Sequence, residues 1–289
     1  MLSAAATGDS AWTHPSSWLD PGYRLADGCQ DWSRIRDSLT AVDLHVWVFQ
    51  SAHSDVMSDW SVLGTGERGR AERLAQAEDR VRFVRGRAMV RRILAAYEGI
   101  EARTITFTAG EYGKPALSAA GAVQCSWSHA GSVWLLAVAR SGAVGIDVER
   151  VDADFAWRGP AEIAFHPHER QFVERSVDGC NGRFYAVWTR KEALLKGLGT
   201  GLHDDMAALS IVNTSGVMCD AVLTPGGTRW QVIGLDMPPG FAGAVTAGFT
   251  VTRITAFAPV GADLSHPLQR SHAVAEPVSS IAAERPWIK

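Results

Sequence analysis

The sequence has few cysteines, no long apolar run and little excess charge, and each shortage excludes a class of protein. Its four cysteines are widely spaced and form no C-x-x-C pair, so neither a zinc site nor a disulfide framework is indicated. We interpret them as reduced thiols, which predicts a cytoplasmic protein. The longest uninterrupted apolar run, residues 133–139, is too short to span a bilayer. The first residues lack the basic start and apolar core of a secretory signal, so we expect no membrane partner.

Common catalytic motifs are scarce as well. The chain contains no G-x-x-x-x-G-K-[ST], H-E-x-x-H or G-x-S-x-G, which argues against P-loop enzymes, zinc proteases and serine hydrolases of the common types. The net charge of −3 predicts no general attraction to nucleic acid. The chain has 289 residues, of which 46% are hydrophobic and 20% charged. This length and composition are typical of one large or two small globular domains.

The hydrophobic patterns predict an α+β protein. Strands are predicted at residues 43–50, 123–129, 133–139 and 144–149. The last three are separated by hairpin-like turns, so we expect an antiparallel meander. Helical stripes run from about 67 to 97 and over 183–198, where Gly199 ends the pattern.

A long helix followed by short strands occurs twice, which suggests two α+β subdomains facing each other. The predicted boundaries are an N-terminal extension at 1–40, an N-terminal half at 41–144, a C-terminal half at 145–258 and a C-terminal tail at 259–289.

The segment WTRKEALLK, residues 188–196, places opposite charges on one face of the second helix. Glu192 and Lys196 are i and i+4, so they lie one turn apart on the same face. Such pairs commonly stabilise exposed helices. A carboxylate that takes a proton and an ammonium that binds phosphate would also suit catalysis. The segment alone leaves both interpretations open.

The segment GIDVE, residues 145–149, adds two carboxylates. On a strand, Asp147 and Glu149 point to one face while Ile146 and Val148 point to the core. Neighbouring carboxylates repel each other unless a cation lies between them, and Mg²⁺, which takes oxygen ligands, suits such a pair. A strand end with solvent-exposed acids would give the same pattern.

Several cations could bind phosphate. Lys114 lies in a tight loop before Pro115, His129 ends a strand, and the arginine-rich stretch 80–92 contains no acid. Charge runs on helices are usually solvated, and isolated histidines are usually structural. Together with a metal-binding acid set and a candidate base, the cations suit phosphoryl-type transfer, in which positioning and charge neutralisation dominate.

These segments resemble the 4′-phosphopantetheinyl transferase superfamily, specifically its larger, surfactin-synthetase-activating type. The resemblance rests on GIDVE and WTRKEALLK, which stand in the order of the family signature. The supporting matches are EYGKP at 111–115, Ser128-His129, and the helix with Arg82 and Gly86. Before His129 the chain departs from the pattern, because Ser126 and Trp127 replace an asparagine and an aliphatic residue.

The resemblance implies a pseudo-dimer of two similar α+β halves, each a small antiparallel sheet packed with a long helix, with the active site in the cleft between them. It implies a monomeric transferase that moves 4′-phosphopantetheine from coenzyme A to a serine of apo acyl or peptidyl carrier proteins. The product would be adenosine 3′,5′-bisphosphate, the cofactor Mg²⁺, and the setting polyketide and nonribosomal peptide biosynthesis.

The same resemblance assigns residues. The metal would be held by Asp147, Glu149 and Glu192. Glu192 would also be the general base, and Lys196 would bind the pyrophosphate and stabilise or protonate the leaving phosphate. The phosphates and the 3′-phosphorylated adenosine would contact Lys114, Ser128, His129 and Arg82, with Arg68 or Arg70 as helpers.

Two other functions stay open. A metal-dependent phosphohydrolase would cleave coenzyme A or a nucleotide diphosphate without any carrier protein. A non-catalytic binder of coenzyme A or of a carrier domain would need no metal. For a transferase, residues 151–182 are the expected carrier-docking region, on analogy with other carrier-binding enzymes.

Overall fold

The protein is an α+β structure, as the sequence predicts. The computed structural model describes residues 32–50, 56–118, 123–176, 179–200 and 206–258. Its α-helices are α1 (Trp32–Ser38), α2 (Val56–Val62), α3 (Thr65–Glu72), α4 (Ala77–Glu98), α5 (Arg158–Ala164), α6 (Pro167–Glu174) and α7 (Cys180–Leu198). Its strands are β1 (Asp43–Gln50), β2 (Phe107–Ala109), β3 (Pro115–Leu117), β4 (Gln124–Ala130), β5 (Val133–Ala139), β6 (Val144–Arg150), β7 (Ala221–Leu223), β8 (Arg229–Leu235), β9 (Phe241–Ala247) and β10 (Arg253–Phe257). Most of the predicted extension at 1–40 and all of the predicted tail at 259–289 lie outside the described residues.

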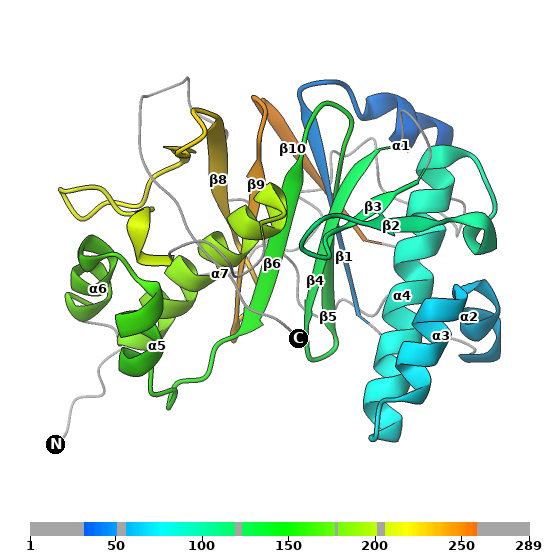
Figure 1. The fold of residues 1–289 in the computed structure, drawn as a ribbon, viewed down its shortest axis with the longest axis horizontal. Coiled ribbons are helices and arrows are strands. Elements are labelled where there is room, and N and C mark those ends of the chain that lie inside the picture. The colour runs from blue at the N-terminus through cyan, green and yellow to red at the C-terminus, as the bar shows by residue number, and fades with distance from the viewer. Residues whose placement is uncertain (1–31, 51–55, 119–122, 177–178, 201–205, 259–289) are drawn as a thin grey trace, which may run out of the picture.

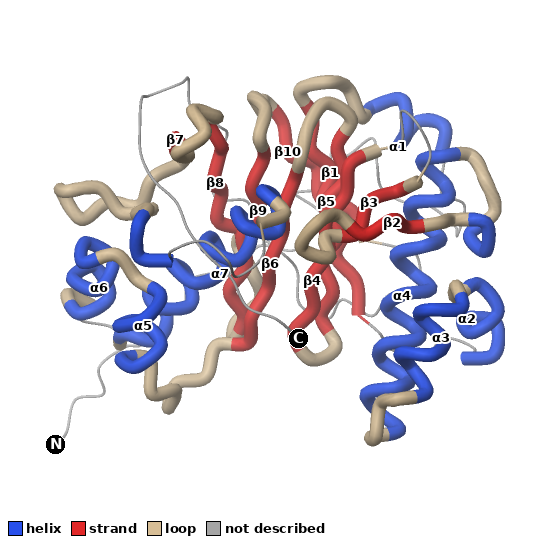
Figure 2. Tube along the Cα trace, viewed as in Figure 1, coloured by secondary structure: helices blue, strands red, loops and turns tan. Residues whose placement is uncertain are grey.

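Two four-stranded sheets form the centre of the fold (Figure 1, Figure 2). The first has the strand order β10-β1-β5-β4 and the second the order β6-β9-β8-β7, while β2 and β3 form a separate short hairpin. Among the described strands, β1 and β10 are the one parallel pair. The expectation of a purely antiparallel sheet is therefore wrong for the first sheet, because the chain returns to it after completing the second.

The run at 144–149 forms the predicted strand, but this strand is not the third member of a meander. β6 pairs with β9, with Asp147 opposite Ala244. At its other edge β6 lies beside β4 of the first sheet, where Ser126 Oγ accepts a hydrogen bond from the Ile146 amide at 3.2 Å. β10, which the predicted boundaries place in the C-terminal half, also belongs to the first sheet. The boundaries themselves stay a prediction.

Alternating side chains sort the sheets into layers. Along β5, Val133 and Leu135 join a core shared with Ile146 of β6, whereas Trp134 and Leu136 join a second core with α4. A third core joins the outer face of the second sheet to α5, α6 and α7. The layers therefore run helix, sheet, sheet, helix, with α4 on one side and α7 on the other (Figure 1).

The two long helices are confirmed with small differences. The stripe predicted over 67–97 is two helices, α3 and α4, and the short helix α2 precedes them. α7 ends at Gly199, whose φ of 73° is the left-handed conformation that favours glycine at a helix end. No helix in the described ranges combines the length and the apolar character needed to cross a membrane.

The contact between β6 and α7 is unusually close at one glycine. A Cβ atom on Gly145 would lie 1.8 Å from the carbonyl oxygen of Ala193 and 2.3 Å from the amide nitrogen of Gly197. Thr246 on β9 adds a hydrogen bond from its hydroxyl to the same Ala193 carbonyl, at 2.9 Å. Main chain therefore packs directly on main chain, which brings Asp147, on the same face of β6 as Gly145, next to α7.

A buried histidine lies among the elements that close the first sheet. Tyr97 Oη accepts a hydrogen bond from Trp47 Nε1 at 3.0 Å and lies 2.7 Å from Nδ1 of His45. Because the hydroxyl has one proton, it donates to an unprotonated Nδ1 when it accepts from the indole. Burial lowers the pKa of His45 to about 4, so this imidazole is neutral in the folded protein.

Gly145→Ala should destabilise the protein by about 3 kcal/mol, because neither main-chain neighbour can move without shifting α7. Equilibrium unfolding in urea measures the effect. Gly182→Ala is the matched control, since Gly182 lies in α7 itself but is exposed with no atom near its Cβ position. This change should be neutral or stabilising by about 1 kcal/mol or less. Equal stabilities for the two variants would contradict the close contact.

The His45 imidazole should make the protein less stable in acid. The folded state resists protonation until about pH 4, whereas the unfolded chain takes up the proton below about pH 6.5, so stability falls as the pH drops through that window. The loss from this group should reach about 2 kcal/mol near pH 5 relative to pH 8. His45→Gln keeps an acceptor for Tyr97 but cannot titrate, so its urea midpoint should fall less over the same range. Identical pH slopes for both proteins would refute the assignment.

Candidate active site

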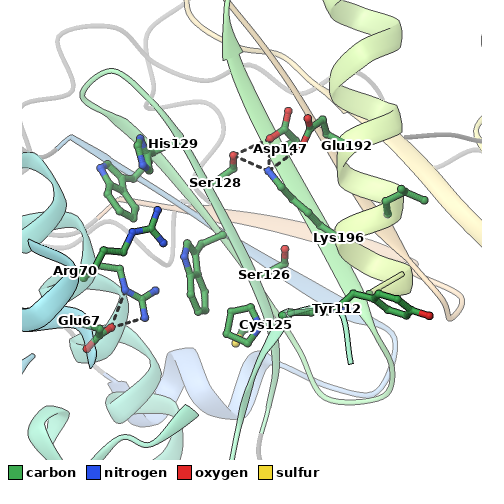
Figure 3. Close-up of a pocket in the computed structure, with 18 of the residues that line it drawn as sticks. Glu67, Arg70, Tyr112, Cys125, Ser126, Ser128, His129, Asp147, Glu192 and Lys196 are labelled. Carbon is green, nitrogen blue, oxygen red and sulfur yellow. Dashed lines mark hydrogen bonds and ion pairs between the residues drawn. The ribbon is translucent and has the colours of Figure 1, made fainter. Parts of the chain in front are cut away.

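A cavity of about 1010 Å³ opens beside β4 and extends from α7 to α3 and α4. Its wall includes the loop between β2 and β3, the face of β4 and the carboxylates of β6. The residues with a predicted site role that line it are Arg70, Lys114, Ser128, His129, Asp147, Glu149, Glu192 and Lys196. Arg82 and the alternative helper Arg68 lie outside the lining. Figure 3 shows Asp147, Glu192 and Lys196 at one end and Arg70 and Glu67 at the other.

Two carboxylates and an ammonium meet where β6 faces α7. Lys196 Nζ lies 2.5 Å from Oδ1 of Asp147 and 3.5 Å from Oε2 of Glu192. Ser128 Oγ, on β4, donates to the same Asp147 oxygen at 2.7 Å and accepts from Lys196 at 3.0 Å (Figure 3). Glu192 and Lys196 are thus not an exposed surface pair, because both carboxylates are only 2% exposed and Lys196 is 29% exposed.

The cluster holds more negative charge than its one ammonium balances. Burial, together with the neighbouring Asp147 and Glu149 carboxylates, raises the pKa of Glu192 well above its usual range. Burial opposes the charge on Lys196, but the carboxylates outweigh it and raise the pKa of this ammonium. The ammonium is therefore held firmly in its charged form.

Two carboxylate oxygens of the cluster have no hydrogen-bond partner in the described part of the protein. They are Oδ2 of Asp147 and Oε1 of Glu192, and both are buried. A buried, unsatisfied carboxylate oxygen is costly unless a cation or donor reaches it, so this pair fits a hard divalent cation. Glu149 lines the same cavity and is half-buried. Among the described residues, however, no three acids, histidines or cysteines are already gathered as a metal centre.

Lys114 is in the cavity wall, but its ammonium binds main-chain carbonyls. It donates to the Val144 oxygen at 3.0 Å and to the Gly197 oxygen at 2.8 Å. These carbonyls belong to the start of β6 and the last turn of α7, so Lys114 ties the hairpin loop to both elements. Burial lowers the pKa of Lys114 to about 8. The phosphate contact expected of Lys114 stays a prediction.

The arginine-rich stretch is not one solvated face. Arg87 and Arg91 are 7% and 2% exposed, and both pair with Glu67 of α3. Arg82 lies outside the cavity lining and pairs with Asp79 at 2.7 Å. The acids that pair with these arginines therefore lie outside the stretch 80–92. Arg92, for example, pairs with buried Asp59 of α2.

Sequence reasoning missed Glu67 and Arg87 as cavity residues. A signal for Arg87 exists: it is i+4 from Phe83 and i−4 from Arg91, so it falls on the stripe that faces the protein interior. Glu67 gives a weaker signal, three residues after Gly64 at a helix start, where its carboxylate accepts the Gly64 amide at 2.8 Å.

Gly64, Gly66 and Gly69 have the G-x-G-x-x-G spacing of dinucleotide-binding loops. Here the spacing falls on the start of α3, which follows helix α2 rather than a strand. The pattern therefore lacks the strand-to-helix turn that gives such loops their function.

Comparison with known proteins identifies the family. A model of the 4′-phosphopantetheinyl transferase superfamily matches residues 143–242. The 4′-phosphopantetheinyl transferase HetI of Nostoc sp. is 30% identical over 171 residues, which cover 57% of this chain and 72% of HetI. The 4′-phosphopantetheinyl transferase ffp of Bacillus subtilis is 26% identical over 188 residues, 65% of this chain and 83% of ffp. The 4′-phosphopantetheinyl transferase Sfp of Bacillus subtilis is 23% identical over 190 residues, again 65% of this chain and 83% of the relative.

The segment matched by the family model contains β6 and α7, the two elements that bring Asp147, Glu192 and Lys196 together. The predicted membership is thus confirmed by comparison as well as by the motifs. The chain belongs to the 4′-phosphopantetheinyl transferase superfamily, as an enzyme of the Sfp-like type.

Proposed function

We propose that this enzyme transfers 4′-phosphopantetheine from coenzyme A to a serine of apo acyl or peptidyl carrier proteins and releases adenosine 3′,5′-bisphosphate. The observation that carries the proposal is the buried cluster of Asp147, Glu192 and Lys196 at one end of a cavity of about 1010 Å³. Its two unsatisfied oxygens and adjacent ammonium suit a pyrophosphate that must be held and neutralised.

Asp147 and Glu192 would hold Mg²⁺ through their unsatisfied oxygens, with Glu149 as the third ligand. When bound, Mg²⁺ would offset the negative charge of the pyrophosphate and make its phosphorus easier to attack. Ser128 supports Asp147 by donating a hydrogen bond to its other oxygen.

In the transfer, Glu192 would accept a proton and Lys196 would neutralise negative charge. The serine oxygen attacks the phosphorus next to the pantetheine arm, and the bond from that phosphorus to the adenosine bisphosphate oxygen breaks. Glu192 takes the serine proton, directly or through a water molecule. Lys196 binds the pyrophosphate and stabilises or protonates the departing phosphate, and its position one helical turn from Glu192 lets it do so beside the base.

The other end of the cavity would hold the adenosine part of coenzyme A, with Arg70 and His129 near its phosphates. We further propose that the two sheets and their long helices form a pseudo-dimer and that coenzyme A lies in the cleft between the halves. The boundaries at 41–144 and 145–258, a monomeric state and a cytoplasmic location belong to the same proposal. Carrier proteins, which are typically acidic, would dock on residues 151–182.

An apo carrier protein incubated with this enzyme, coenzyme A and Mg²⁺ should gain the mass of one phosphopantetheine, and adenosine 3′,5′-bisphosphate should appear in equal amount. Intact-protein mass spectrometry and nucleotide chromatography measure the two products. A carrier with its serine replaced by alanine is the control. Release of the nucleotide without carrier modification would instead support a phosphohydrolase, and no change in either would leave only a binder.

Asp147→Ala and Glu192→Gln should each lower the rate of transfer by at least about a hundredfold. Glu192→Gln should nevertheless fold at least as stably as the parent, because it removes a buried charge with an unsatisfied oxygen. Glu101→Gln, at an exposed carboxylate outside the cavity lining, is the matched control and should keep full activity. The rates come from single-turnover mass spectrometry and the stabilities from thermal unfolding. Activity in the Asp147→Ala, Glu192→Gln double variant would refute the metal assignment.

A further inference from the structure

Three basic side chains in the cavity, at the end away from Glu192, each lie on an aromatic ring. The Arg70 guanidinium lies 5.3 Å from the centre of the Phe83 ring, and that of Arg87 lies 4.2 Å from the centre of the Trp127 ring. The imidazole of His129 stacks on Trp134 with ring centres 4.4 Å apart and planes 25° apart. All six residues line the cavity. Two of the rings, those of Phe83 and Trp134, are in turn buried, at 9% and 1% exposure.

The Trp134 ring is fixed by the helix behind it. A Cβ atom on Gly86 of α4 would lie 2.0 Å from two carbons of the indole, so the ring rests directly on the helix backbone. His129 lies on an indole that cannot move toward α4. The stacked imidazole therefore has a rigid support.

The Arg87–Trp127 pair is fixed from the arginine side. Arg87 Nε donates to Oε1 of Glu67 at 2.7 Å, while Phe107 lies 5.1 Å from the guanidinium carbon. Nη1 of Arg87 is buried with no hydrogen-bond partner in the described part of the protein. The guanidinium carbon of Arg87 lies over the face of Trp127. The Glu67 carboxylate also accepts the Gly64 amide at the start of α3, the helix to which both Glu67 and Arg70 belong.

Stacking on a ring orients a cation without using its hydrogen-bond donors, and it replaces part of the water shell. Arg70 and His129, held in this way, would present donors at fixed positions to a compact dianion such as a phosphate monoester. Arg87, whose Nε and Nη2 pair with Glu67, lies beside them. Asp147 and Glu192 at the opposite end of the cavity would repel the same group, whereas Glu67 at this end is paired with Arg87 and Arg91.

We propose that Phe83, Trp127 and Trp134 form an aromatic floor that holds Arg70, Arg87 and His129 in place, and that these rings are positioning residues for a phosphate monoester on the nucleotide. The inference rests on the proposed function only in taking the nucleotide to be part of coenzyme A.

Isothermal titration of the full chain with adenosine 3′,5′-bisphosphate and with adenosine 5′-monophosphate tests the proposal without requiring any transfer. The parent protein should bind the bisphosphate at least about tenfold more tightly, because the second ligand lacks one phosphate. Trp134→Leu should reduce that ratio by about fivefold, whereas Trp134→Phe, which keeps an aromatic face under His129, should preserve most of it. Phe83→Leu, which removes a smaller ring from under Arg70, should also reduce the ratio. It provides the test if Trp134→Leu does not fold.

Trp157→Leu is the matched control. Trp157 is also buried, at 6% exposure, and carries Arg158 at 4.6 Å from its ring centre, but it lies outside the cavity lining. Its loss should lower stability and leave the affinity ratio unchanged.

The proposal is overturned if the parent binds both nucleotides equally, if Trp134→Leu keeps the parent ratio, or if Trp157→Leu lowers the ratio as much. A protein that shows the expected ratios but transfers nothing would contradict the proposed function and leave this inference standing. If the enzyme transfers phosphopantetheine but Trp134→Leu and Phe83→Leu keep the parent affinity ratio, the proposed function stands and this inference is refuted.

Discussion

The site depends on the direct packing of α7 on β6 at Gly145. Because no side chain separates the two backbones there, Asp147, two residues along the strand, reaches the helix face that carries Glu192 and Lys196. A larger residue would push the helix outward and separate the carboxylates from the ammonium. The Thr246 hydroxyl and the Lys114 ammonium bind main-chain carbonyls of α7 and so hold the helix in the same place from β9 and from the hairpin loop.

This arrangement leaves two buried carboxylate oxygens unsatisfied within the described protein. Such groups destabilise a fold unless something binds them, and they therefore occur where a ligand is expected. The fold can tolerate them because three cores surround the site: one between the sheets and one under each long helix. The site thus combines a rigid frame with local electrostatic strain, as transfer chemistry at a charged substrate requires.

Much of the fold could be predicted from local pattern. The strand at Asp43–Gln50, the strand at Val133–Ala139 and the end of α7 at Gly199 follow from alternation, β-branched residues and glycine at a helix end. Strand partners could not be predicted, since pairing depends on residues far apart in the chain. β10 lies parallel to β1 although more than two hundred residues separate them, and β6 pairs with β9 instead of β5.

For the site, the sequence by itself determined the chemistry: the alternation of Asp147 and Glu149, the helical spacing of Glu192 and Lys196, and the family to which these segments belong. Tertiary structure alone decided which charged side chains are buried and which opposite charge each one contacts. It paired Arg87 with Glu67, turned the Lys114 ammonium toward two carbonyls, and kept Arg82 out of the cavity. The physical reason is that spacing along one element fixes the direction of a side chain. Its burial, charge partner and pKa depend on elements that meet it only when the chain is folded.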